Sequence, residues 1–173
     1  MLGAVVGLAP ALEPDDELEA VPASETAIIG VAPAEARVPA PLELCATVAA
    51  RIHVTPDRSD EELLAVELDE EHFASSCEHW EMVIDEELRG GDKTSLTAFD
   101  EAYVAEIEDL CGPIEPEHHA RIELASERGA VADTVAELGL PAPGLMRIRR
   151  VCTQRLCARP AHRERYFETL DRQ

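Results

Sequence analysis

The sequence predicts an all-α protein: a degenerate two-repeat helical bundle of about seven to eight helices behind a disordered Pro/Ala/Glu-rich arm. Aromatic residues make up 3% of the chain, and Ala and Leu dominate its apolar residues, which favours helices over sheets. From residue 42 onward, apolar residues recur with the period of an amphipathic helix. The order of these segments repeats once, so the helical domain (42–173) divides into repeats at about 42–111 and 112–173.

Residues 1–41 form the predicted arm. Six prolines interrupt any helical or strand period there: Pro10, Pro14, Pro22, Pro33, Pro39 and Pro41. We therefore expect a flexible, extended segment. The apolar start of the chain has no Lys or Arg before Arg37 and is too short to span a membrane, so we predict neither a secretory signal nor a transmembrane helix.

The first repeat is predicted to begin with two short helices. The apolar face of the first helix, which ends before Pro56, consists of Leu44, Cys45, Val48 and Ile52. The second helix, over Asp60–Leu68, directs three leucines inward: Leu63, Leu64 and Leu68.

A helical hairpin over Asp69–Leu110 completes the first repeat. Asp69 is placed to cap its first helix, Gly90-Gly91 to end that helix, and Thr94 to cap the second. Large residues on the two apolar faces are the predicted core anchors: Phe73, Trp80, Ile84, Phe99 and Tyr103. The short link favours an antiparallel pair whose apolar faces bury against each other or against a third element.

The second repeat contains four further helical segments separated by Gly and Pro. Pro116 starts the first, which stops near Gly129, and Val131–Leu138 forms the second. The apolar face of the third consists of Leu145, Ile148, Val151, Cys152 and Leu156. The last follows Pro160 and carries Tyr166, Phe167 and Leu170.

The two repeats align with small changes of offset that loops absorb. Related positions recur at offsets of 74, 72 and 68 residues: Glu43–Ala46 with Glu117–Ala120, Leu68 with Leu140, Phe73 with Leu145, Trp80 with Cys152, Ile84 with Leu156, and Phe99 with Phe167. Equivalent helices are therefore expected to pack in equivalent ways.

Charge is unevenly distributed along this acidic chain, whose net charge is −21. Residues 42–111 carry twenty acidic and four basic residues, whereas residues 112–173 carry nine acidic and ten basic ones. Nucleic acid and anionic membranes would repel such a chain. We therefore expect no nucleic-acid or membrane partner, and an unidentified, basic protein partner instead.

The third helix of the second repeat is rich in arginine, whereas its counterpart over residues 69–87 is acidic. We predict that the two helices lie near each other, or that the arginine face docks acidic partners. The candidate interaction surface consists of Arg147, Arg149, Arg150, Arg155, Asp85, Glu86 and Glu87. Reversing the charges of Arg149 and Arg150 should lower stability or partner binding.

No residue pattern predicts catalysis, a cofactor or a metal site. Cys77 and His79 lie two apart on a helix and so point in different directions, and Glu115-x-x-His118 spans a helix start. The sequence contains no nucleophile elbow and no nucleotide-binding glycine motif. Five cysteines without a close CxxC pair indicate free thiols in a reducing compartment, and we expect a cytoplasmic protein.

Several segments carry a family resemblance: Leu68–Glu70, Glu78–Trp80, Ala98–Tyr103, Gly112–Ile114 and Ile148–Val151. Over residues 42–170 the chain resembles an uncharacterised bacterial helical repeat segment, found in proteins linked with type VI secretion or effector-adaptor clusters. It departs from this pattern at Cys152, where an aromatic Trp is expected. The resemblance transfers no catalytic residue and implies an interaction or adaptor role.

These observations favour a protein–protein interaction or adaptor module without catalytic chemistry. The alternative is a helical bundle that binds a metal ion or a small ligand and has enzymatic activity. Stoichiometric Fe or Zn in the purified protein would favour that alternative.

Overall fold

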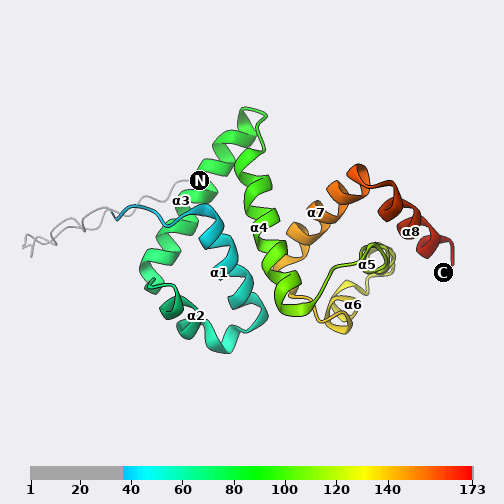
Figure 1. Cartoon of the computed structure of the whole chain (residues 1–173), viewed down its shortest axis with the longest axis horizontal. Helices are drawn as coiled ribbons and strands as arrows, with labels where there is room; N and C mark the ends of the chain where they lie inside the picture. Colours follow the sequence, from blue (N-terminus) through cyan, green and yellow to red (C-terminus); the bar gives the residue numbers. More distant parts are fainter. Residues whose placement is uncertain (1–36, 173) are drawn as a thin grey trace, which may run out of the picture. The chain divides into compact units, whose positions relative to one another are not determined.

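The computed structural model describes residues 37–172, and in this part of the chain the protein is all-α, as predicted. The predicted arm lies outside the described residues as far as position 36. The eight α-helices of the described part (Figure 1) are α1 (Leu42–Val54), α2 (Ser59–Ala65), α3 (Glu70–Arg89), α4 (Thr94–Cys111), α5 (Pro116–Arg128), α6 (Val131–Glu137), α7 (Leu145–Ala158) and α8 (Pro160–Asp171). Short 3₁₀ turns cover Pro56–Arg58 and Ala142–Gly144.

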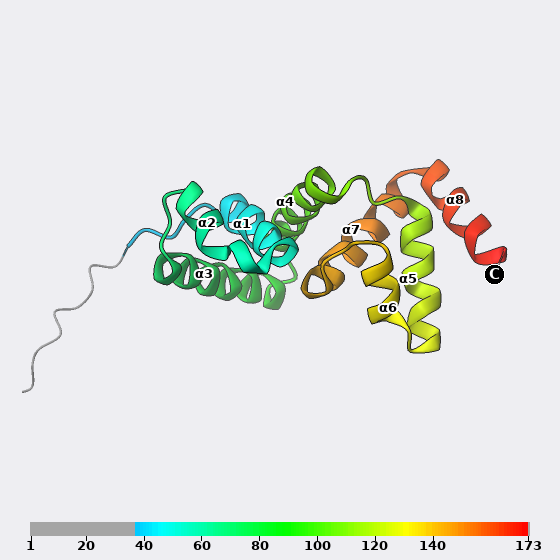
Figure 2. The same cartoon turned by 90° about the horizontal axis from the view of Figure 1, so that it is seen from below.

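The helices form two repeats of four. α1 and α5 have 13 residues each, and α2 and α6 have 7 each. In each half, the first helix packs most extensively against the fourth, so that α1 lies beside α4 and α5 beside α8 (Figures 1 and 2). The predicted two-repeat helical bundle is therefore confirmed.

The first helix of each half, with the residues that lead into it, shares five buried positions with its counterpart. In the first half these positions are Ala40, Leu42, Cys45, Ala46 and Val48. Their counterparts 74 residues later are also buried: Ile114, Pro116, His119, Ala120 and Ile122. The duplication thus preserves burial more strictly than it preserves residue type.

The loop before the third helix is also duplicated. Leu68 N donates to Leu63 O at 3.0 Å, and Leu140 N donates to Val135 O at 3.1 Å. Each bond joins residues five apart and closes the end of a right-handed helix, at which the preceding residue adopts a left-handed backbone conformation. The residue that needs a positive φ is Glu67 (59°) in the first half and Gly139 (67°) in the second.

Helix α4 joins the two halves. It packs against α1 of its own half and against α7 of the other. Tyr103, Val104 and Ile107 of α4 are fully buried. Gly144 must be glycine at its place before α7, because a Cβ there would overlap the Tyr103 side chain.

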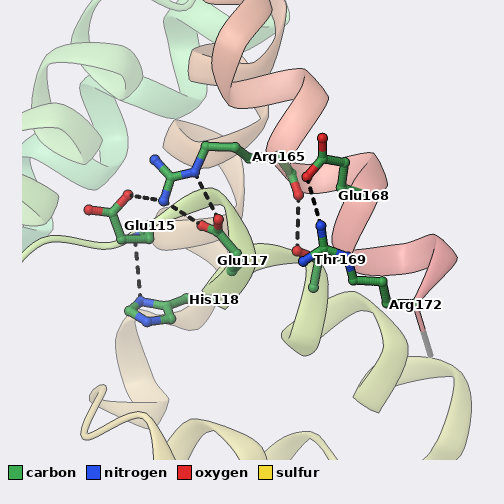
Figure 3. Close-up of polar contacts among 7 residues, drawn as sticks. All are labelled: Glu115, Glu117, His118, Arg165, Glu168, Thr169 and Arg172. Carbon is green, nitrogen blue, oxygen red and sulfur yellow. Dashed lines mark hydrogen bonds and ion pairs between the residues drawn. The ribbon is translucent and has the colours of Figure 1, made fainter.

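Helix α8 is held on α5 by an ion-pair cluster. Arg165 of α8 pairs with Glu115 at 3.0 Å and with Glu117 at 2.8 Å, both at the start of α5 (Figure 3). In the same cluster, the Glu115 backbone N–H donates to His118 Nδ1 at 3.3 Å. These carboxylates also lie where the helix dipole favours negative charge.

Two local expectations need correction. Leu64 is 77% exposed, not inward, because α2 ends at Ala65 and its one buried position is Leu63. At the start of α4 the capping group is Asp92, whose Oδ1 accepts from Thr94 N at 2.9 Å, whereas Thr94 provides no cap. Asp69 does cap α3, since its side chain accepts from His72 N at 2.7 Å.

Residues 37–40 run along α3 before α1 begins. Arg37 pairs with Asp69, and His72 Nε2 lies 3.0 Å from Val38 O. Ala40 N donates to Ser76 Oγ at 2.9 Å. Contacts with the helical domain therefore begin about five residues before its predicted start at residue 42.

Candidate functional site

Helix α3 is only half covered by the rest of the domain. Ser76 is its one buried residue, although the helix has 20 residues. The predicted anchors of α3 (Phe73, Trp80 and Ile84) are partly buried, whereas Phe99 and Tyr103 of α4 are buried. The apolar face of α4 packs mainly on α1, so the expected α3–α4 hairpin leaves α3 with an open side.

A cavity of about 220 Å³ follows from this arrangement; we call it the Trp80 pocket. α1, α3 and α4 line it, together with one residue of α7. The lining residues are Ala49, Ile52, His53, Phe73, Cys77, Trp80, Glu81, Ile84, Phe99 and Arg147. Four of the five predicted core anchors thus form the wall of a pocket.

The indole of Trp80 is fixed by a hydrogen bond. Its Nε1–H donates to Ala40 O at 2.8 Å. A partly buried indole needs such a partner. The segment before α1 therefore sets the position of one wall of the pocket.

His53, which lines the pocket, belongs to a neutral polar pair. His53 Nδ1 lies 2.8 Å from the Tyr103 hydroxyl. Burial, together with the nearby Arg147, lowers the pKa of His53, and burial raises the pKa of Tyr103 to about 12. Both rings are therefore uncharged at neutral pH, which keeps this part of the pocket compatible with an apolar occupant.

The cysteine in the pocket stays protonated. A hydrogen bond with Cys45 and burial raise the pKa of the Cys77 thiol. Cys45 in turn lies 3.7 Å (Sγ) from Ala40 O and is fully buried. A nucleophilic cysteine needs the opposite shift of pKa.

The four predicted surface arginines of α7 pair with carboxylates of α4 and α5, not with the acidic end of α3. Arg147 and Arg150 share Asp100, which is 2% exposed. Arg149 pairs with Glu123 at 2.6 Å, and Arg155 pairs with Glu108 at 2.7 Å. Hydrogen bonds to Asp100 and Glu108 raise the pKa of Arg150 and Arg155 respectively.

The acidic residues of the predicted surface have local partners or face solvent. Glu86 pairs with Arg89 of the same helix, and Glu87 accepts from Ser95 Oγ at 2.6 Å. Asp85 is exposed. The structure therefore does not bring the two charged groups of the predicted surface together.

Sequence reasoning missed Asp100 as the centre of the α4–α7 contact. The sequence does contain an indication of this role, an acidic residue on the apolar face of a helix. Asp100 lies four residues after Leu96 and three before Tyr103, so the three share one face. A buried carboxylate needs basic partners, and α7 supplies two of them.

A second and larger cavity, of about 650 Å³, lies over α7; we call it the α7 groove. Its lining comes from α4, α5, α7 and α8 and from Lys93: Lys93, Leu96, Thr97, Asp100, His119, Glu123, Met146, Arg149, Arg150, Thr153, Gln154, Leu156 and Tyr166. Figure 2 shows α5, α7 and α8 side by side in this half of the domain.

The α7 groove is the repeat counterpart of the Trp80 pocket. Four lining positions correspond at the repeat offsets: Ala49 with Glu123, Cys77 with Arg149, Glu81 with Thr153, and Ile84 with Leu156. At Trp80 the counterpart is Cys152, whose small side chain does not reach the groove. The duplication has thus produced two related cavities of different size and charge.

Buried His119 lines the α7 groove and is only partly satisfied. Its Nε2 lies 3.3 Å from Glu123 Oε1, and its ring centroid lies 5.2 Å from that of Tyr166. Its Nδ1 has no hydrogen-bond partner among residues 37–172. Burial lowers the pKa of His119, so the ring is neutral at pH 7 and its contact with Glu123 is a hydrogen bond.

Within residues 37–172, no three His, Cys, Asp or Glu side chains are arranged so that they could hold a metal ion. Over the same residues, no helix has the length and apolar content needed to cross a membrane. Comparisons of the chain with protein-family models, with curated proteins and with solved structures give no match.

Proposed function

We propose that the protein is a cytoplasmic protein–protein interaction or adaptor module, whose Trp80 pocket receives an apolar side chain from a basic segment of a partner protein. The observation that carries this proposal is the half-covered α3, whose Phe73, Trp80 and Ile84 line an open pocket. Aromatic residues at such a position are typical binding hot spots. The family resemblance of residues 42–170 supports the same role.

The size of the pocket favours a side-chain anchor over a free small molecule. Sites for drug-sized ligands commonly measure about 300–1,000 Å³. The Trp80 pocket measures about 220 Å³. This volume suits one or two apolar side chains presented by a helix or an extended segment.

The charge around the pocket selects the kind of partner. α3 carries seven acidic residues and one basic residue, and Glu81 lies in the lining of the pocket itself. A segment with Lys or Arg beside its apolar anchor would be attracted to this rim and oriented by it. Acidic surfaces, nucleic acid and anionic membranes would be repelled.

Trp80 is the only tryptophan of the chain, so its fluorescence reports directly on the pocket. The full chain would be titrated with a peptide of repeated Lys-Lys-Leu-Leu and with its Glu-Glu-Leu-Leu counterpart. We expect the basic peptide to produce a saturable change in Trp80 emission and the acidic peptide to produce none.

Matched charge reversals locate the binding site. Glu81→Lys should weaken binding of the basic peptide about tenfold, because it places a positive charge at the rim of the pocket. Asp133→Lys makes the same change at an exposed position of α6 and should have little effect. Equal effects of the two variants, or no emission change in the parent chain, would rule out the Trp80 pocket as the site.

A further inference from the structure

The α7 groove differs from its repeat counterpart mainly in charge. Where the Trp80 pocket has Cys77 and Glu81, the groove has Arg149 and Thr153. Lys93 and Arg150 add two further positive charges to its lining, against the carboxylates of Asp100 and Glu123. Although the chain has a net charge of −21, this cavity is locally basic.

The carboxylates in the groove are already compensated. Asp100 is 2% exposed and accepts hydrogen bonds from both Arg147 and Arg150. Glu123 accepts two hydrogen bonds from Arg149, at 2.7 and 2.6 Å. The positive charge of exposed Lys93 is therefore added to pairs that are close to neutral.

Donors remain for a further acceptor. Arg149 and Arg150 bind their carboxylates through Nε and Nη2. A guanidinium has five N–H donors, so within residues 37–172 the Nη1 group of each arginine is left for another carboxylate.

The groove also has an apolar part. Leu96, Leu156 and Tyr166 line it, and Met146 does so while being 58% exposed. Methionine at an exposed position adapts to ligands of different shape. The lining thus combines apolar contact with cationic groups, a combination that suits an acidic amphipathic segment.

We propose that the α7 groove binds an acidic segment of a partner protein, with apolar side chains against Met146 and Leu156 and carboxylates on Lys93, Arg149 and Arg150. This site is separate from the Trp80 pocket and selects the opposite charge. The two repeats would thereby hold two different partner segments at once. A partner segment is favoured over a small acid because the lining spans four helices.

A labelled peptide of repeated Glu-Glu-Leu-Leu tests the proposal by fluorescence anisotropy on the full chain. Non-specific attraction cannot explain its binding, because the net charge of −21 repels it. We expect saturable binding that weakens as salt concentration rises. The Lys-Lys-Leu-Leu peptide should not compete for this site.

The variants change exposed lining residues that form no helix-to-helix ion pair. Lys93→Glu with Met146→Glu should weaken binding of the acidic peptide at least about tenfold, and Gln154→Lys, at an exposed polar position of the lining, should strengthen its binding. Glu81→Lys, at the Trp80 pocket, should leave the affinity for the acidic peptide unchanged. Circular dichroism checks that each variant remains folded. If the double variant does not fold, Gln154→Lys alone decides between the two outcomes.

Three results would overturn the proposal. The first is the absence of saturable binding by the acidic peptide at low salt. The second is binding that Gln154→Lys fails to strengthen. The third is displacement of the peptide by free glutamate at equal concentration, which would identify a small carboxylic acid as the occupant. Failure of the basic peptide at the Trp80 pocket would leave each of these readouts intact.

Discussion

Glu67 holds a backbone conformation that its counterpart Gly139 adopts without strain. Its φ of 59° costs an L-residue about 1–2 kcal/mol, whereas glycine adds about 0.5–1 kcal/mol of backbone entropy to the unfolded chain. We therefore predict that Glu67→Gly raises the free energy of unfolding by up to about 1 kcal/mol, as measured by urea denaturation. Gly139→Ala, the matched reverse change, should lower it.

The cysteines should differ sharply in reactivity. Cys111 and Cys157 are exposed, whereas Cys152 is 5% exposed and burial raises its pKa to about 11. Since the thiolate is the reactive species, iodoacetamide at pH 7.5 should label Cys111 and Cys157 first and Cys152 only in urea. Mass spectrometry of peptides over time measures the order, and early labelling of Cys152 would show that α7 opens readily.

Half-buried His53 and buried His119 make stability depend on pH. Burial lowers the pKa of His53 and of His119 below the ordinary 6.5, despite the opposing effect of Glu123 on His119. The unfolded chain then binds protons at a higher pH than the folded chain. The contribution of the two neutral histidines to the free energy of unfolding is therefore present above pH 6.5. It is lost as the pH falls through and below that value.

We therefore predict a fall in the free energy of unfolding between pH 7.5 and pH 5, measured by urea denaturation. His119→Gln should reduce this fall, because it removes one titrating group while keeping a polar side chain. Carboxylates with lowered pKa values, such as Glu108, act in the same direction but at lower pH. An unchanged pH profile in His119→Gln would mean that His119 titrates in the same way in both states.

At the scale of elements, Asp100 ties α7 to α4. Its replacement by Ala would leave Arg147 and Arg150 without their shared carboxylate. Loss of one partner of a buried pair costs about 3–5 kcal/mol, and the partial exposure of both arginines, 28% and 38%, reduces this. We predict that Asp100→Ala lowers the free energy of unfolding by about 2 kcal/mol, as measured by urea denaturation.

The surface pair Glu168–Arg172 of α8 provides the comparison for this value. Both side chains are more than half exposed (52% and 75%), and they lie one turn apart on one helix. Glu168→Ala should change stability by less than about 0.5 kcal/mol. Similar losses for Asp100→Ala and Glu168→Ala would show that Asp100 does not join the halves.

At the scale of the whole molecule, the sequence predicted the helices and their order better than their neighbours. Gly129 ends α5 and Pro160 begins α8, and both were predicted because glycine and proline act on the local backbone. The repeat offset of 72 residues, which aligns Trp80 with Cys152, likewise follows from the order of residues along the chain. Helical period identifies the apolar face of α3 but not the element that covers it. For this reason the Trp80 pocket was predicted as core, and Arg149 was assigned no partner in α5.

Because α4 contributes to the cores of both halves, the domain should unfold as one unit. Tyr103 and Ile107 of α4 are fully buried, while Asp100 on the same helix binds α7. Emission of Trp80 reports on the first half, whereas far-ultraviolet circular dichroism reports on all helices. We predict coincident urea transitions by the two probes, the mark of a two-state process.

Asp100→Ala tests whether this cooperativity passes through the α4–α7 contact. The loss of that contact removes the ion pairs of Arg147 and Arg150 but leaves the α1–α4 core, which Trp80 senses, intact. The circular dichroism transition should then begin at lower urea than the emission transition, because the second half opens first. Glu67→Gly, which acts only within the first half, should shift the two transitions together. If they remained superimposed in Asp100→Ala as well, the apolar contact of Tyr103 with the segment around Gly144 would be sufficient to couple the repeats.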